Sequence, residues 1–239
     1  MVKYKLLAVD IDGTITIDRN TYKLDLNVVS YMRLLEKHGI MVVLLSSNAL
    51  PVVAGLKRYF GLKGPAVGET GALIYFGNDE VVRLSKYSAK EALKYVLEKY
   101  GDYLKESWQN PFRLHDFALK LKKPIGDVKG FISKVKADVE KRYPYIRVSY
   151  SGFAVHLTPI DVSKAKALEL IIERYGLSTD EVVAIGDSVM DIDYVSMAGL
   201  GVAVSNADEE LKAVAKYVTK NPSSSGFIEL AEMLLENKI

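Results

Sequence analysis

Two carboxylates stand two residues apart at the end of an apolar run near the start of the chain. Residues 8–14 read AVDIDGT, so Asp10 and Asp12 follow a stretch, 4–9, that is typical of a buried strand. Like charges at this spacing repel each other, and their removal from water is costly. A divalent cation is the first candidate to offset that cost, and carboxylate oxygens suit Mg²⁺.

Other polar groups follow apolar runs elsewhere in the chain. The run 40–45 leads into hydroxyl side chains, the run 181–187 ends in an aspartate, and a lysine opens the helix predicted before that run. Ligands of an open parallel sheet bind beyond the carboxyl ends of its strands, so we expect these groups to converge there. The expected group is Asp10, Asp12, Ser46, Ser47, Lys164, Asp187 and Asp191.

Converged in this way, the groups resemble the parts of a phosphoryl-transfer centre. A cation, a lysine ammonium, a hydroxyl and backbone amides freed by Gly13 would surround one phosphate. One carboxylate could attack phosphorus, and another could protonate the leaving alkoxide and later activate water.

The elements that must position these residues alternate between strand and helix, which predicts an α/β fold with a doubly wound parallel sheet. Helices are predicted from apolar spacing and from the glycines that follow several of them. The predicted strands are 4–10, 40–45, 71–76, 181–187 and 199–206, and the predicted helices are 25–38, 50–61, 164–176 and 225–237.

The middle of the chain breaks this rhythm. Helices are predicted at 88–105 and 125–142, a strand at 112–123, and a hairpin around Ser151-Gly152. This mixture predicts a small α+β domain at 81–157, inserted into a discontinuous core made of residues 1–80 and 158–239.

Composition narrows the classes of partner. The chain has 239 residues, 49% hydrophobic and 26% charged, with a net charge of +2 and no cysteine. Near-neutral charge argues against nucleic acid or an anionic membrane as the main partner, and no apolar stretch is long enough to span a bilayer. With no secretory pattern at the N-terminus and no possible disulfide, we expect a cytoplasmic protein, monomeric or homodimeric. The scattered histidines His38, His115 and His156 are predicted to be structural.

The motifs together resemble the haloacid dehalogenase-like hydrolase superfamily. Its pattern of Asp-x-Asp-x-Thr, Ser/Thr, Lys and Gly-Asp-x-x-x-Asp occurs here in family order, as Asp10-x-Asp12-x-Thr14, Ser46, Lys164 and Gly186-Asp187-x-x-x-Asp191. The insert lies where members with a C2-type cap carry theirs. The stretches VSKAKAL and GVAVSNADEELK resemble the archaeal phosphoglycolate phosphatases within this group.

The resemblance implies roles for the four aspartates. Asp10 would be the nucleophile and a Mg²⁺ ligand, and Asp12 would be the general acid and base and would bind the metal through its carbonyl. Asp187 would ligate Mg²⁺, and Asp191 would complete or support that ligation.

The resemblance also implies a phosphate-binding set. Ser46 and Lys164 would hold the phosphate, with Ser47 beside it and Asn206 lining the same crevice. Two positions depart from the family pattern, since relatives often have glycine at Ser47 and asparagine at Met190.

The implied function is a Mg²⁺-dependent phosphatase acting on a small phosphate ester, with 2-phosphoglycolate as the substrate that the resemblance suggests. Arg113 of the insert could meet a substrate carboxylate, because a planar guanidinium suits one, or could form a surface ion pair. Alternatives are a sugar-phosphate phosphatase or phosphomutase of the same fold and, from another class, a receiver-type signalling module with a phosphorylatable aspartate.

Overall fold

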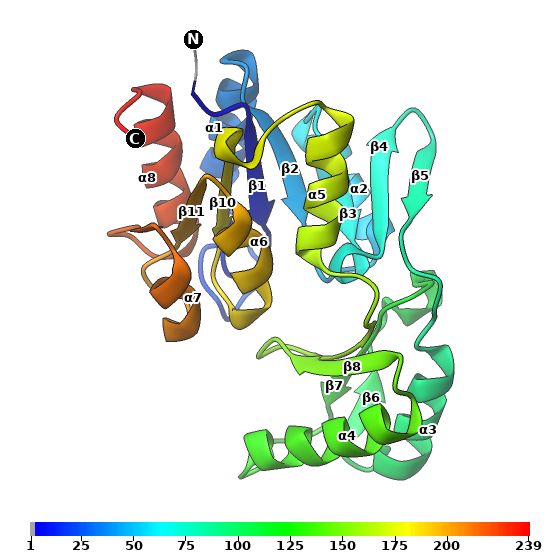
Figure 1. Cartoon of the computed structure of the whole chain (residues 1–239). Coiled ribbons are helices and arrows are strands. Elements are labelled where there is room, and N and C mark those ends of the chain that lie inside the picture. Colours follow the sequence, from blue (N-terminus) through cyan, green and yellow to red (C-terminus); the bar gives the residue numbers. More distant parts are fainter. Residues whose placement is uncertain (1–2) are drawn as a thin grey trace.

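The computed structural model describes residues 3–239 and contains two separate sheets (Figure 1). The larger sheet has eight strands, all parallel except β4, which pairs antiparallel with both β3 and β5. This confirms the predicted α/β class, with a mixed rather than wholly parallel sheet. In sheet order its strands are β12 (Tyr217–Val218), β11 (Leu200–Ala203), β10 (Val182–Gly186), β1 (Leu6–Asp10), β2 (Met41–Leu45), β3 (Ala66–Gly68), β4 (Leu73–Gly77) and β5 (Glu80–Arg83).

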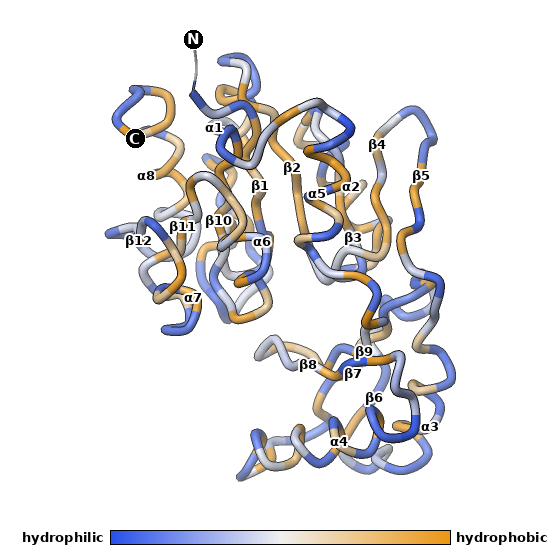
Figure 2. The backbone as a smooth tube through the Cα atoms, viewed as in Figure 1, coloured by the Kyte–Doolittle hydropathy of each residue, from blue (hydrophilic) through white to orange (hydrophobic). Residues whose placement is uncertain are grey.

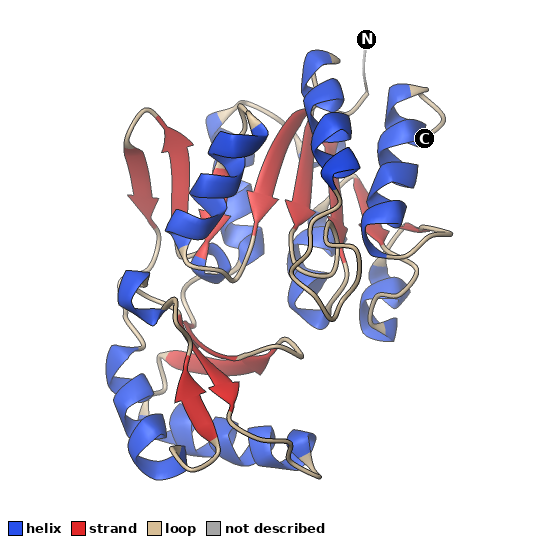
Figure 3. Ribbon diagram, turned by 180° about the vertical axis from the view of Figure 1, so that it is seen from behind, coloured by secondary structure: helices blue, strands red, loops and turns tan. Residues whose placement is uncertain are grey.

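Helices cover both faces of the larger sheet, as the doubly wound prediction requires (Figure 3). One face carries α1 (Leu26–Lys37), α2 (Leu50–Phe60) and α8 (Ser223–Leu235), and the other carries α5 (Lys164–Arg174), α6 (Ile192–Met197) and α7 (Glu209–Val214). The central strands are buried on both faces, and Figure 2 shows the hydrophobic residues that run along them. Such strands need apolar side chains in both directions, which explains their unbroken apolar runs.

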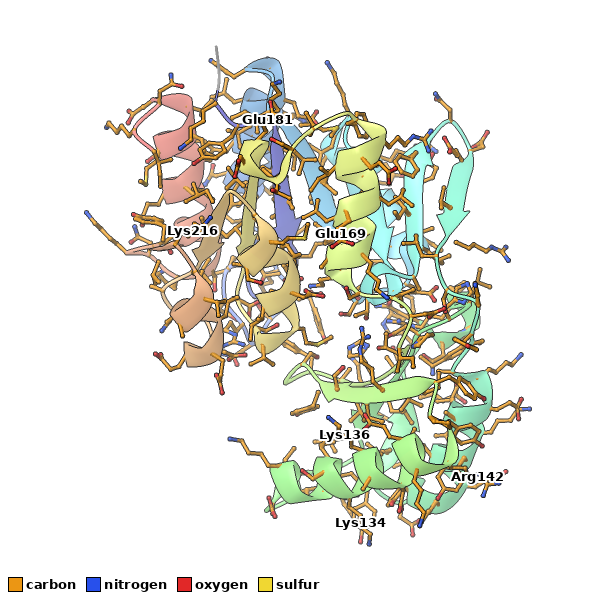
Figure 4. The ribbon with its side chains drawn as sticks, in the orientation of Figure 1. Lys134, Lys136, Arg142, Glu169, Glu181 and Lys216 are labelled. Carbon is orange, nitrogen blue, oxygen red and sulfur yellow. The ribbon has the colours of Figure 1, made fainter. Side chains whose placement is uncertain are left out.

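The insert has its own antiparallel sheet and its own hydrophobic core. Its strands, in sheet order, are β6 (Leu104–Glu106), β7 (Phe117–Leu121), β9 (Val155–Pro159) and β8 (Ile146–Tyr150). Helices α3 (Lys90–Tyr100) and α4 (Val128–Arg142) pack on the side of this sheet away from the larger one (Figure 1). Figure 4 shows Lys134 and Arg142 on α4, at the end of the molecule distant from the larger sheet.

Two predicted elements of the insert were too long. The helix predicted at 88–105 ends at Tyr100, and β6 follows within the same stretch and pairs with β7. The strand predicted at 112–123 begins only at Phe117. Pro111 instead lies in a short 3₁₀ turn, and the backbone from 113 to 116 turns toward the larger sheet.

The sheets also locate the ends of the insert. Strand β5 belongs to the larger sheet, whereas β9 belongs to the smaller one. We therefore propose that the insert begins after Arg83 and ends after Pro159, slightly later at both ends than the predicted 81–157. Among residues 3–239, no helix combines the length and the apolar character that a membrane span requires.

Candidate active site

The carboxyl ends of β1 and β10 approach each other very closely at Gly13. Its φ is +97°, and a Cβ atom at this position would lie 2.3 Å from Oδ2 of Asp187. Only glycine adopts this conformation readily and leaves room for the carboxylate. The glycine of the AVDIDGT stretch thus allows the last motif to lie directly against the first.

Three aspartates from these two strand ends meet at one buried point. Oxygen atoms of Asp10, Asp187 and Asp191 lie within 4.8 Å of one another, and all three side chains are buried. Asp191 is held by its own turn, because its Oδ2 accepts the backbone N–H groups of Asp187 and Ser188 at 3.0 and 3.1 Å. The spacing of four residues between Asp187 and Asp191 therefore builds one side of the cluster.

Lys164, the first residue of α5, reaches into the same point. Its Nζ lies 2.5 Å from Oδ1 of Asp10 and 2.6 Å from Oδ1 of Asp191. The backbone just before it is fixed on two sides. Ser163 caps α5, and Gly71, at φ +99°, approaches so closely that a Cβ there would lie 2.0 Å from the carbonyl oxygen of Ser163.

The protonation equilibria of the cluster reflect its burial. Burial raises the pKa of Asp10 well above its ordinary value, against the lowering effect of Lys164, and Asp191 adds to the rise. Burial and the charge of Asp191 raise the pKa of Asp187 to about 7. Burial by itself would lower the pKa of Lys164, but Asp10 and Asp191 raise it above the ordinary value, so the ammonium stays charged.

Arg19 is a member of the site that sequence reasoning missed. Its Nε lies 2.7 Å from Oδ2 of Asp187, and its Nη1 lies 2.9 Å from Oδ1 of Asp208. The residue stands in a loop with no strand end or motif to mark it. The loop after β1 lies beside the end of β10, and this fold brings Arg19 to Asp187.

The donor set fits a hard divalent cation. Asp10, Asp187 and Asp191 offer only oxygen ligands, and the cations beside them are Lys164 and Arg19, the latter shared with Asp208. Negative charge therefore remains in excess at a buried point, which a bound Mg²⁺ would neutralise. Asp12 lies outside this cluster of three.

Asp12 instead meets the residues that follow β2. Nδ2 of Asn48 donates to Oδ2 of Asp12 at 2.7 Å and to Oγ of Ser46 at 3.0 Å. Burial raises the pKa of Asp12, and the hydrogen bond from Asn48 opposes the rise. Asn48 thus joins the ends of two adjacent strands, β1 and β2.

The insert docks on this edge through the segment 107–116. Gln109 donates from Nε2 to Oδ1 of Asn48 and accepts the backbone N–H of Ala49, both at 2.7 Å. Arg113 is buried and donates from Nη2 to the carbonyl oxygen of Ser47 at 2.9 Å. The exposed ion pair considered for Arg113 is therefore wrong, because its partner Asp116 is buried as well, at 2.7 Å.

A cavity of about 410 Å³ lies between the carboxyl edge of the larger sheet and the insert. From the larger sheet and its loops it is lined by residues that include Asp10, Asp12, Ser46, Ser47, Lys164 and Asp187. From the insert it is lined by residues that include Trp108, Gln109, Arg113, Lys120 and His156.

Asn206 lies beside this cavity rather than on its wall. It is not one of the lining residues, its Nδ2 donates to Oγ of Ser223 at 3.0 Å, and its carbonyl oxygen accepts from Arg19 at 3.1 Å. Arg19 contacts both Asn206 and Asp187, so Asn206 is connected to Asp187 only through Arg19. Any contact between Asn206 and a substrate stays a prediction.

Comparison with known proteins extends across nearly the whole chain. A phosphoglycolate phosphatase of Staphylothermus marinus is 52% identical over 97% of this chain and 98% of its own length. A phosphoglycolate phosphatase of Archaeoglobus fulgidus is 35% identical over 98% of both chains.

Solved structures agree with the fold. A Thermoplasma acidophilum protein of 26% identity has a TM-score of 0.84 and covers 97% of this chain and 98% of its own. A haloacid dehalogenase-like hydrolase from Bacteroides thetaiotaomicron, at 21% identity, has a TM-score of 0.77 over 98% of this chain and 100% of its own.

The sequence also matches a family description directly. Residues 7–123 and 109–230 match the haloacid dehalogenase-like hydrolases, and these ranges hold the strand ends that carry the aspartates and the lysine. The protein therefore belongs to the haloacid dehalogenase-like hydrolase family.

Proposed function

We propose that this chain is a Mg²⁺-dependent phosphatase that hydrolyses 2-phosphoglycolate to glycolate and phosphate. The observation that carries the proposal is the contact of Lys164 with Asp10 inside the buried carboxylate cluster, at the wall of a cavity. A relative that is 52% identical over 97% of this chain is named as a phosphoglycolate phosphatase. Phosphate monoesters hydrolyse extremely slowly unaided, so concentrated charge of this kind is what the reaction needs.

In the proposed reaction, a carboxylate oxygen of Asp10 forms a bond to phosphorus while the ester P–O bond breaks. Asp12 gives its proton to the departing alkoxide, and the raised pKa of Asp12 helps it to carry that proton. Asp12 then takes a proton from water, whose oxygen bonds to phosphorus as the bond to Asp10 breaks. Lys164 and Ser46 hold phosphoryl oxygens in both steps. Asp10, Asp187 and Asp191 would hold Mg²⁺, which would supply positive charge to the phosphoryl group.

The test is the Asp10→Asn variant assayed for phosphate release from 2-phosphoglycolate. The amide cannot act as the nucleophile, so we expect kcat to fall by roughly 10³-fold or more. Asp102→Asn, a substitution at an exposed position in the insert, is the matched control and should keep full activity. Near wild-type turnover by Asp10→Asn would rule out the covalent route.

Two alternatives remain distinguishable by experiment. A phosphomutase would return the phosphoryl group to a sugar, and release of inorganic phosphate decides against it. A receiver-type module would keep its phospho-aspartate for minutes, whereas membership of a hydrolase family favours turnover. The state of assembly, monomer or homodimer, and the cytoplasmic location stay predictions.

A further inference from the structure

One face of the smaller sheet forms the wall of the cavity opposite the carboxylate cluster. In the antiparallel pair of β7 and β9, Ala118 stands opposite His156. Residues two apart along a strand share a face, so Lys120 and Ala154 lie on the same face as this pair. All four residues line the cavity, while the alternate residues Leu119, Val155 and Leu157 are buried in the core of the insert. The register thus places Lys120 and His156 on the face that lines the cavity, with the small side chains of Ala118 and Ala154 between them.

Lys120 forms no ion pair within the described part of the chain. It stands directly opposite Lys105 in the pairing of β6 and β7, and like charges in that position destabilise a sheet. Between residues 3 and 239, neither lysine forms an ion pair; Nζ of Lys120 only approaches Tyr22, 3.4 Å from its hydroxyl and 5.4 Å from its ring centroid. A positive charge without an ion pair at the wall of a cavity indicates an anionic ligand.

His156 contributes a second polar group to the same wall. The residue is 4% exposed, and its Nδ1 lies 3.2 Å from Oδ1 of Asp116. A carboxylate at Nδ1 fixes the orientation of the ring. Nε2 is the ring nitrogen left to meet a ligand, because no group among residues 3–239 forms a hydrogen bond with it.

Arg113, the residue that sequence reasoning nominated for a substrate carboxylate, is already engaged. Its Nη1 donates to Asp116 and its Nη2 donates to the carbonyl oxygen of Ser47, so both ends of the guanidinium fork are taken. Its remaining Nε is buried and has no partner among the described residues. This geometry makes Arg113 a residue that holds the insert against β2, with at most its Nε free for a ligand, so other groups on the wall are needed to bind a carboxylate.

We propose that Lys120 and His156 form the subsite that binds the carboxylate of the leaving group, so that the insert selects phosphate monoesters of short hydroxy acids. The inference rests on the proposed phosphatase function and names the groups that would give it specificity. The phosphoryl end lies at Asp10 and Lys164, and the carboxylate end lies against the opposite wall. Ala118 and Ala154 add no bulk between Lys120 and His156, which leaves space for a carboxylate there.

The experiment compares kcat/KM for 2-phosphoglycolate and for ethyl phosphate, which has the same length but lacks the carboxylate, both with Mg²⁺. We expect Lys120→Met and His156→Gln each to lower kcat/KM for 2-phosphoglycolate by about 10- to 100-fold, as the loss of a charged hydrogen-bond partner does. Ethyl phosphate should change less than about threefold, and this activity also shows that each variant is folded. Lys120→Arg should retain most of the preference.

Lys134→Met is the matched control, because it removes the same charge from an exposed position on α4 far from the cavity (Figure 4). It should leave both substrates unaffected. An equal loss for both substrates in Lys120→Met, or an unchanged preference in both subsite variants, would overturn the subsite while the phosphatase function stands. A wild-type enzyme that cleaves p-nitrophenyl phosphate but shows no preference for 2-phosphoglycolate over ethyl phosphate would instead overturn the proposed substrate.

Discussion

At the scale of single residues, Gly13 sets how closely the ends of β1 and β10 approach. The positive φ of Gly13 and the nearby carboxylate of Asp187 leave no space for a side chain. Asp187 belongs to the cluster that we expect to bind the metal, so a shift of its carboxylate changes the ligand geometry directly.

Gly13→Ala should therefore weaken both folding and activity. We expect a loss of about 1–3 kcal/mol in the free energy of unfolding, the range for strained backbone positions, and a fall of roughly tenfold or more in kcat. Denaturant titration and phosphate-release assays measure the two effects. Gly126→Ala is the control, because its Cβ would meet no atom within 4 Å. A variant at Gly13 that matches this control would contradict the steric account.

Single site residues were predictable from the sequence where they lie next to the end of a recognisable strand or helix. Asp10 and Asp187 each follow an apolar strand, and Lys164 opens the helix that leads into β10, so the parallel sheet brings all three to one edge. Arg19 was not predictable, because its place depends on how an irregular loop folds across β10. His156 was interpreted as structural, and the structure shows it both buried and at the wall of the cavity.

At the scale of elements, the segment 107–116 fastens the insert to the larger sheet. Glu69 is fully buried and its carboxylate accepts the backbone N–H groups of Leu114, His115 and Asp116. Asp116 in turn accepts from Thr70 at 3.0 Å. These contacts join two segments that lie far apart in the sequence, so a local pattern could not reveal them.

Asp116→Asn should destabilise the protein in a pH-dependent way. Burial raises the pKa of Asp116, but His156, Arg113 and Thr158 together lower it below its ordinary value. A carboxyl whose pKa is lower in the folded state adds stability above its unfolded pKa of about 4, and that stability is lost as pH falls through the folded pKa. We expect the variant to lose about 3 kcal/mol of unfolding free energy at pH 7.

The difference in unfolding free energy between wild type and Asp116→Asn should narrow below about pH 4, as the wild type loses the same charge. Urea unfolding at several pH values measures it. A difference that widens toward acid would show that the pKa of Asp116 is not lowered.

Long apolar elements were predictable and short ones were not. Strands β1, β2 and β10 are buried on both faces and appear as unbroken apolar runs. By contrast, β6 has only Leu104 buried, and its pairing with β7 supplies the order that its own residues lack. The helix predicted at 88–105 was too long because the sequence at β6 has no strand pattern.

At the scale of the whole molecule, the cavity lies between two parts with separate hydrophobic cores, the larger sheet with its helices and the insert. The larger part contributes the buried carboxylates at the wall of the cavity. Carboxylates that are far apart in the unfolded chain must come together on folding, and their repulsion opposes it. A cation that binds only the folded arrangement would relieve this repulsion and stabilise the fold.

Magnesium should therefore raise the thermal midpoint. At 100 times its dissociation constant we expect about 2.7 kcal/mol of stabilisation, or roughly 5–10 °C for a chain of this size. Differential scanning calorimetry with Mg²⁺ and then with a chelator measures the shift. Asp187→Asn should abolish it, and Asp180→Asn, at an exposed position, should keep it. An equal shift in both variants would place the cation elsewhere.

The backbone contact between Gly71 and Ser163 bears on how the enzyme opens and closes. The chain returns from the insert through 160–163, and Lys164 follows at once. Because Gly71 lies directly against Ser163, the last residue of this return path is anchored to the larger sheet. Any swing of the insert must then be absorbed before that point, within 84–89 and 160–162. Lys164 would then keep its contact with Asp10 while the cavity opens to release glycolate.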